Sequence, residues 1–74
     1  RAVDLQVAER TQLAAVRRAV LALPQRQRAA LLLRKYQELD YAEIAAALGC
    51  SETAARANVY QALKKLRLLF QEKD

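Results

Sequence analysis

The amino-acid sequence predicts an all-α fold built from four helices. Apolar residues recur three and four positions apart along most of the chain, and no segment shows the strict alternation of a β-strand. The single proline and the single glycine, Pro24 and Gly49, interrupt this pattern where helices commonly begin and end. The chain has 74 residues, of which 54% are hydrophobic, and we therefore expect residues 1–74 to form one small domain.

The first two helices are predicted on either side of Pro24. Residues 5–22 form the first, whose apolar face holds residues three, four and three positions apart: Leu13, Val16, Val20 and Leu23. Pro24 cannot continue that helix but suits the first position of the next, which we expect over about residues 24–37. The apolar face of this second helix is predicted to hold Ala29, Leu32, Leu33 and Tyr36, and Arg26 and Arg28 are expected to point away from it.

A short third helix is predicted over about residues 41–48. Asp40 is a suitable N-cap, and Glu43, three residues later, completes a capping box. At helical spacing, three apolar residues of this segment are expected to face inward: Ile44, Ala45 and Leu48.

A tight turn and a longer helix follow. Gly49 is suited to end the third helix in the left-handed conformation, and Ser51 can cap a fourth helix over about residues 52–70. A short helix, a three-residue turn and a longer helix are typical of the helix-turn-helix, here over about residues 40–70. An ordinary helical hairpin also favours glycine at its turn, and the placement of charge favours the DNA-binding motif.

The charge of the chain indicates an anionic partner. Thirteen Lys and Arg residues and eight Asp and Glu residues give a net charge of +5, which favours nucleic acid first and a membrane surface second. One side of the fourth helix is apolar, with Ala55, Val59, Ala62, Leu66, Leu69 and Phe70. The opposite side holds Thr53, Arg56, Ala57, Tyr60, Gln61, Lys64 and Arg67. This basic stripe has the width of a DNA groove, and the helix lacks the tryptophan common at membrane surfaces.

The outer stripe has the chemistry to contact DNA bases. The candidate contacts are Arg56 with guanine, Asn58 or Gln61 with adenine, and Ala57 or Tyr60 with the methyl group of thymine. Lys64 and Arg67 lie further along the helix, where it would leave the groove and meet phosphates. Tyr60 has a second interpretation, as a partly buried ring that covers the helix pair.

Other functional classes find little support in the sequence. The chain has no histidine, a single cysteine, no glycine-rich phosphate loop and no cluster of carboxylates, so we expect no catalytic residue, cofactor or metal site. Cys50 is expected to pack beneath the helix crossing. No apolar run approaches the about 18 residues of a membrane span, and no signal peptide opens the chain. We therefore expect a cytoplasmic protein that is not an enzyme and has no membrane partner.

The segment "LPQRQRAALLLRKYQELDYAEIAAALGCSETAARANVYQALKKLR", residues 23–67, resembles region 4 of bacterial sigma factors, most closely the extracytoplasmic-function group. The matching positions are Leu23-Pro24, Arg28, Leu33-Arg34, Glu43-Ile44-Ala45, Leu48-Gly49, Ser51, Ala62 and Leu66-Arg67. This sigma region 4-like pattern covers well over half of the chain. A sigma factor also needs a domain that melts the promoter, so we expect this sequence to be part of a longer protein.

The resemblance implies a transcription-initiation domain with three kinds of partner. These are double-stranded promoter DNA, whose −35 element it would recognise in the major groove, the RNA polymerase core, and an anti-sigma factor. By this resemblance, Arg56, Ala57, Tyr60 and Gln61 occupy positions that contact bases or neighbouring phosphates. Arg28 and Arg34 would lie near the DNA backbone or the polymerase. Ser51 and Thr53, at the start of the fourth helix, complete the expected contacts to the backbone.

This chain departs from the family pattern at three places on the fourth helix. It has Ala54-Ala55 where the family often has Thr-Val, Ala57-Asn58 where the family often has Ser-Arg, and Gln61 where the family often has Arg. Each missing phosphate-binding cation lowers the salt dependence of DNA binding by about one unit. The departures are compatible with an element that contains adenine, or with a domain whose main contacts are with protein.

Two alternative functions stay open. A response-regulator effector domain shares much of the helix-turn-helix pattern, although the Leu23-Pro24 stretch fits it less well. A sigma-like protein-interaction module, held by a regulator, would use the apolar end of the fourth helix, with Leu63, Leu66, Leu68, Leu69 and Phe70. These leucines would instead be core residues if they packed on the first helix.

Overall fold

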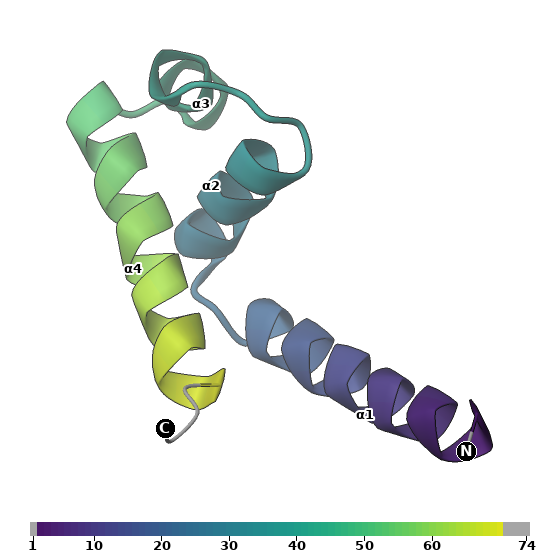
Figure 1. Ribbon diagram of the computed structural model, residues 1–74. Helices are drawn as coiled ribbons and strands as arrows, with labels where there is room; N and C mark the ends of the chain where they lie inside the picture. Colours follow the sequence, from purple (N-terminus) through teal and green to yellow (C-terminus); the bar gives the residue numbers. More distant parts are fainter. Residues whose placement is uncertain (1, 71–74) are drawn as a thin grey trace.

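The structure, a computed structural model, describes the backbone of residues 2–70 and the side chains of residues 12–69. The described residues form four helices: α1 (Ala2–Leu21), α2 (Gln25–Lys35), α3 (Tyr41–Leu48) and α4 (Glu52–Phe70). The helices α2, α3 and α4 pack together, and α1 extends away from them as an arm (Figure 1). The radius of gyration is 14.6 Å, whereas a compact chain of this length has about 11 Å. The predicted all-α fold is confirmed.

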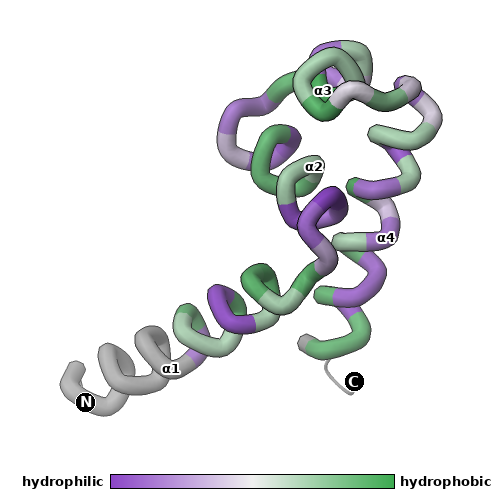
Figure 2. The backbone as a smooth tube through the Cα atoms, turned by 180° about the vertical axis from the view of Figure 1, so that it is seen from behind, coloured by the Kyte–Doolittle hydropathy of each residue, from purple (hydrophilic) through white to green (hydrophobic). Residues whose placement is uncertain are grey.

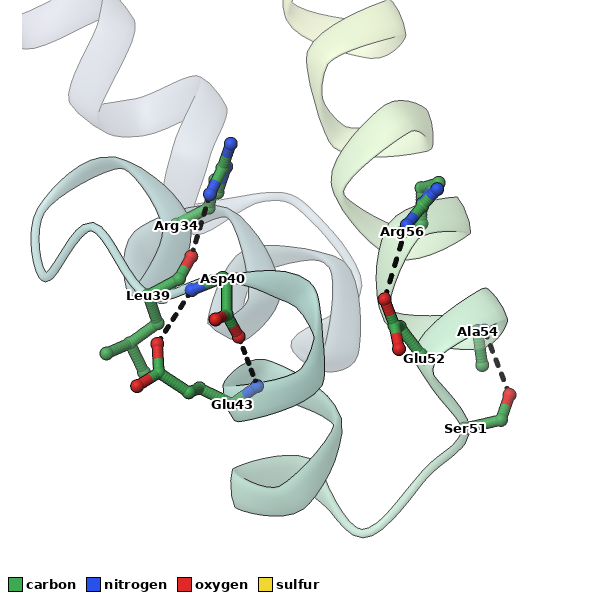
Figure 3. A network of polar contacts seen from close by, with 8 residues as sticks. All are labelled: Arg34, Leu39, Asp40, Glu43, Ser51, Glu52, Ala54 and Arg56. Atoms are coloured by element: carbon green, nitrogen blue, oxygen red, sulfur yellow. Dashed lines mark hydrogen bonds and ion pairs between the residues drawn. The ribbon is translucent and has the colours of Figure 1, made fainter.

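The caps of the helix-turn-helix form as the sequence predicts. The backbone N–H of Glu43 donates to Asp40 Oδ1, and the N–H of Asp40 donates to Glu43 Oε1, both over 2.8 Å, so the capping box is complete (Figure 3). Gly49 ends α3 in the left-handed conformation, at φ 70° and ψ 40°. The N–H of Ala54 then donates to the hydroxyl of Ser51 over 3.0 Å. The direction of α4 is thus set by local hydrogen bonds around one glycine.

The core between α2, α3 and α4 is made mostly of small side chains. Ile44 and Val59 are its largest buried members, and three alanines from the three helices complete the cluster: Ala30, Ala45 and Ala55. A second cluster lies nearer to α1 and consists of Leu23, Leu31 and Ala62, with Leu63 and Leu66 partly buried beside it. Alanines at the crossings let the helix backbones approach closely, and this close approach takes the place of a large apolar volume.

The predicted apolar face of α2 is wrong by two positions, except at Leu33, which packs against the core as predicted. Ala30 and Leu31 are its buried residues, whereas Tyr36 forms the C-cap and is 80% exposed. The inward face follows the spacing of an amphipathic helix but has a polar residue at each end, at Gln27 and Arg34. Both polar side chains are partly buried, and Gln27 Oε1 has no hydrogen-bond partner among the described residues. A prediction that considers only apolar residues therefore misplaces the inward face of α2, because two of its members are polar.

The junction between α1 and α2 combines a buried leucine with a side-chain hydrogen bond. Leu23 is buried, and Pro24 is the N-cap of α2, one position before the first helical position predicted for it. Arg28 Nη1 donates to the carbonyl oxygen of Leu21 over 2.8 Å and so satisfies one free carbonyl at the end of α1. Beyond this junction α1 has few neighbours, and its apolar residue Leu13 is 68% exposed.

The apolar end of α4 divides into two parts. Leu63 and Leu66 lie against the second cluster, so for them the core interpretation is correct. Leu69, on the apolar side of α4, is 65% exposed, and Leu68 beside it is also exposed. For these two residues the exposed alternative is correct, because α1 diverges from α4 and does not cover its last turn (Figure 1). The side chain of Phe70 lies outside the described residues.

Candidate nucleic-acid interface

The outer face of α4 is a continuous exposed stripe. Every residue predicted for it is exposed: Thr53, Arg56, Ala57, Tyr60, Gln61, Lys64 and Arg67. The opposite face holds the buried residues Ala55, Val59 and Ala62. Because the buried and exposed residues separate cleanly around one helix, α4 presents its polar face at full length while remaining fixed to α2 and α3.

Two of the candidate base contacts differ in their placement. Tyr60 is 56% exposed, so its ring does not cover the helix pair and stays on the outer face. Asn58 is partly buried, unlike the other four candidates. The structure therefore brings Arg56, Ala57, Tyr60 and Gln61 together on the exposed stripe and leaves Asn58 at its margin.

Arg56 is held by two neighbours while remaining largely exposed. Its Nη2 lies 3.4 Å from Glu52 Oε2, one helical turn earlier, and its side chain is 58% exposed (Figure 3). Its guanidinium carbon also lies 4.6 Å from the centroid of the Tyr41 ring, which belongs to α3. An exposed ion pair of this length is weak, so it leaves the guanidinium free to exchange Glu52 for another acceptor.

The candidate backbone contacts on α2 both have partners within the chain. Arg34 Nη1 donates to the carbonyl oxygen of Leu39 over 2.9 Å, and its guanidinium carbon lies 4.8 Å from the centroid of the Tyr41 ring. Arg28 holds the end of α1, as described above. A guanidinium has five N–H donors, so these contacts leave donors for DNA phosphates or for a protein partner. They also give both arginines a role in the fold.

The remaining candidate backbone contacts are exposed. Ser51 and Thr53 lie at the start of α4, and Lys64 and Arg67 lie in its C-terminal half. The hydroxyl of Ser51 accepts the capping hydrogen bond from Ala54, so its role in the fold is that of an N-cap.

A second surface feature is an apolar groove between α1, α2 and α4. It measures about 1030 Å³. Apolar side chains make up most of its lining, among them Leu13, Val16, Val20, Leu31, Leu63 and Leu66, and three cations also contribute: Arg17, Arg18 and Lys35. No acidic residue lines it among the side chains that the structure describes. In Figure 2 the C-terminal half of α1 alternates between hydrophobic and hydrophilic segments, as expected for a helix with one apolar face.

Comparison with protein families identifies this arrangement. The model of the family described as "Sigma-70, region 4" matches residues 13–66, which include all of α2 and α3 and most of α4. The chain belongs to the sigma-70 region 4 family. No curated protein and no solved structure matches the chain. Sigma-70 region 4 is a helix-turn-helix domain that binds DNA in the initiation of transcription, and the helix-turn-helix predicted from the sequence is thereby confirmed.

The matched segment of this region 4 chain contains both surfaces. Residues 13–66 include all the residues that line the groove and the four exposed candidate base contacts on α4, although Arg67 of the stripe lies just outside the match. Within the part of the chain that the structure describes, no group of acidic, cysteine or histidine side chains could hold a metal ion. In the same part, each helix is too short or too polar to span a membrane.

Sequence reasoning missed one residue of the interface, Tyr41. It follows the capping residue Asp40 and was expected only to begin α3. Its ring contacts arginines that lie seven residues before it and fifteen residues after it. The two arginines lie on other helices than Tyr41, so no local pattern could reveal the cluster. The only available signal was an aromatic residue between two basic helices.

Proposed function

We propose that this chain is the domain of an extracytoplasmic-function sigma factor that recognises the −35 promoter element and docks on RNA polymerase. The observation that carries the proposal is the exposed stripe on α4, which combines basic, amide and aromatic side chains along one face. A helix of this kind fits the major groove, where side chains meet the base edges and cations meet the phosphates. Arg56, Ala57, Tyr60 and Gln61 are assigned to base edges, and Lys64 and Arg67 to the backbone.

The groove between α1, α2 and α4 supports the docking part of the proposal. Its apolar floor and its three cations, with no acidic residue among the described lining, suit a helix that has an apolar face and acidic flanks. The groove lies apart from the α4 stripe, because its α4 residues, Leu63 and Leu66, belong to the partly buried side. The two surfaces would therefore allow simultaneous contact with DNA and with the polymerase.

The DNA-binding part is tested by selection from a random duplex library, followed by fluorescence anisotropy in low and moderate salt. We expect one short element to be enriched. Arg56→Ala and Gln61→Ala should each reduce the preference for that element by about 5- to 150-fold, since each removes a base contact. Arg26→Ala, on the exposed start of α2, is the matched control for a lost charge, and it should weaken binding equally for all sequences. Failure to enrich any element, also with polymerase present, would reject the proposal.

The docking part is tested with two leucines of nearly equal exposure. Leu13 is 68% exposed and lines the groove, whereas Leu69 is 65% exposed and does not line it. Leu13→Asp should weaken binding to the polymerase core at least tenfold, because it places a charge on the apolar floor and repels acidic flanks. Leu69→Asp should leave binding within about twofold. Equal effects of the two variants would show that the groove is not the docking site.

A second candidate function, a protein-interaction module held by an anti-sigma factor, is favoured by the apolar surface beyond the core. The exposed residues Leu68 and Leu69 continue the apolar character of α4 past the groove. This function predicts a stable complex with a regulator and only weak, sequence-independent binding to DNA. The selection experiment separates the two functions, because enrichment of one element is expected only for the promoter-binding domain. The response-regulator alternative receives no support from the family match.

A further inference from the structure

The Tyr41 ring lies at the meeting point of three helices. It stands at the first position of α3, and two guanidinium groups approach it, Arg34 from α2 at 4.8 Å and Arg56 from α4 at 4.6 Å. Both distances are within the range of a cation–π interaction. The family match assigns no role to this residue, and its ring contacts one of the candidate base contacts, Arg56.

The Tyr41 ring has a firmly determined position. The capping box between Asp40 and Glu43 fixes the backbone on both sides of it, with two hydrogen bonds of 2.8 Å. The hydrogen bond from Arg34 to the carbonyl oxygen of Leu39 fixes the residue that precedes the box. Tyr41 also packs against the core cluster that contains Ile44. The ring therefore acts as a rigid surface against which a mobile arginine side chain can be ordered.

Contact with a ring orders a guanidinium without using its hydrogen bonds. A cation–π contact acts through the face of the ring, whereas the N–H donors of arginine lie in the plane of the guanidinium and form the fork that fits guanine O6 and N7. The other partner of Arg56, Glu52, does use a donor, but at 3.4 Å and with both side chains more than half exposed. Such a pair is easily exchanged, whereas the ring contact can persist when DNA binds.

We propose that Tyr41 is a positioning residue that determines specificity, because it orders Arg56 for paired hydrogen bonds to one guanine while Glu52 serves as an exchangeable partner in the free protein. This inference rests on the proposed function, because it requires that α4 recognises bases. By this inference α3 influences base recognition through Arg56 of α4, and the side chain of Tyr41 itself need not touch the DNA.

The test measures base discrimination at each position of the selected element. Duplexes with every single base-pair change are compared by fluorescence anisotropy for the unaltered chain, Tyr41→Phe, Tyr41→Leu and Arg56→Lys. Tyr41→Phe retains the ring and should retain discrimination. Tyr41→Leu retains apolar packing and should reduce discrimination by about two- to fivefold, at one guanine only, as expected for loss of one exposed cation–π contact. Arg56→Lys should weaken the preference at that same guanine, because an ammonium lacks the planar fork that presents two hydrogen bonds side by side.

Two further measurements separate positioning from a general structural role. In an Arg56→Ala background, Tyr41→Leu should cause no additional loss of discrimination. Glu52→Gln should raise affinity for all duplexes and leave the ratios between bases unchanged, because it removes a competing acceptor and a negative charge. If Tyr41→Leu lowers stability too far for DNA binding, NMR of the Arg56 Nε–H in the free chain provides the test. Its ring-current shift should be present in the unaltered chain and in Tyr41→Phe, and absence of the shift from both would overturn the inference.

The outcomes also separate this inference from the proposed function. If the unaltered chain selects an element and Tyr41→Leu retains full discrimination at every position, the inference is overturned and the promoter-binding function stands. A uniform loss of affinity in Tyr41→Leu, without a change in base ratios, would also overturn it. If the unaltered chain selects no element, the proposed function fails and this inference fails with it.

Discussion

The two ends of this molecule are built differently. At the helix-turn-helix end, a capping box, a left-handed glycine and a serine cap define the helix boundaries, and Ile44, Ala55 and Val59 are almost fully buried. At the α1 end, Leu13 and Leu21 remain largely exposed, and α1 extends away from the other helices (Figure 1). At the first end, the backbone groups at the helix boundaries have hydrogen-bond partners within the chain, and these apolar side chains are buried. The second leaves apolar side chains exposed, and it is the end at which we propose docking.

The largest effect on stability is expected when a buried side chain at the first end is shortened, and the comparison is with an exposed side chain shortened at the second end. Ile44→Ala should lower the free energy of unfolding by about 2–5 kcal/mol, because it removes the largest fully buried side chain and leaves a cavity. Leu13→Ala should change it by less than about 0.5 kcal/mol. Urea denaturation followed by circular dichroism measures both. A similar loss in the two variants would mean that α1 contributes to the core in solution.

Gly49 gives the next largest effect. Nothing lies within 4 Å of the position that a Cβ atom would occupy there, so a side chain meets no steric obstacle. Gly49→Ala should nevertheless lower the free energy of unfolding by about 1–2 kcal/mol, because a Cβ atom is disfavoured in the left-handed conformation. Gly49→Asn should be less harmful, since asparagine tolerates this conformation. If alanine and asparagine prove equally tolerated, the backbone of the turn must have changed.

The caps come third. Asp40→Ala and Ser51→Ala should each lower the free energy of unfolding by about 1 kcal/mol, because each leaves an N–H at a helix start without its acceptor. Thermal denaturation detects a loss of this size. Asp40→Asn is the matched control, because its side chain can still accept the hydrogen bond. An unchanged melting temperature in both alanine variants would contradict the idea that local caps define this end.

The smallest expected effect is a gain in stability at Glu38, between α2 and α3. This residue has a φ of 56°, in the left-handed region. Glu38→Gly should raise the free energy of unfolding by about 0.5 kcal/mol, because relief of the backbone strain exceeds the added chain entropy of glycine. Glu38→Ala, which keeps a Cβ atom, should bring no such gain. Chemical denaturation of the two variants side by side would show whether glycine is favoured.

Much of the fold could be predicted because its boundaries depend on local chemistry. Asp40, Gly49 and Ser51 act within a few residues of themselves, so their positions in the sequence are sufficient to place α3 and α4. The outer stripe of α4 was likewise predictable from helical spacing. The inward face of α2 was not, because Gln27 and Arg34 lie at its ends and carry no apolar signal.

The features that escaped prediction depend on contacts distant in sequence. Leu69 could have been a core residue or an exposed one, and its exposure follows from the direction of α1, which no spacing along α4 reveals. The cluster of Tyr41 with Arg34 and Arg56 joins three helices. The groove likewise forms only when α1, α2 and α4 are placed together. Helices were therefore predictable, whereas surfaces shared between helices were not.

The alanine-rich core has a thermodynamic consequence. A domain of 74 residues has an unfolding free energy of about 4–11 kcal/mol, and a core of small side chains leaves little room to increase it by repacking. A partner present at a hundred times its dissociation constant adds about 2.7 kcal/mol by mass action. The free energy added by a partner bound at either surface would thus be large compared with the unfolding free energy of the chain alone. The midpoint of thermal unfolding would then report, in a mixture, whether this chain is bound or free.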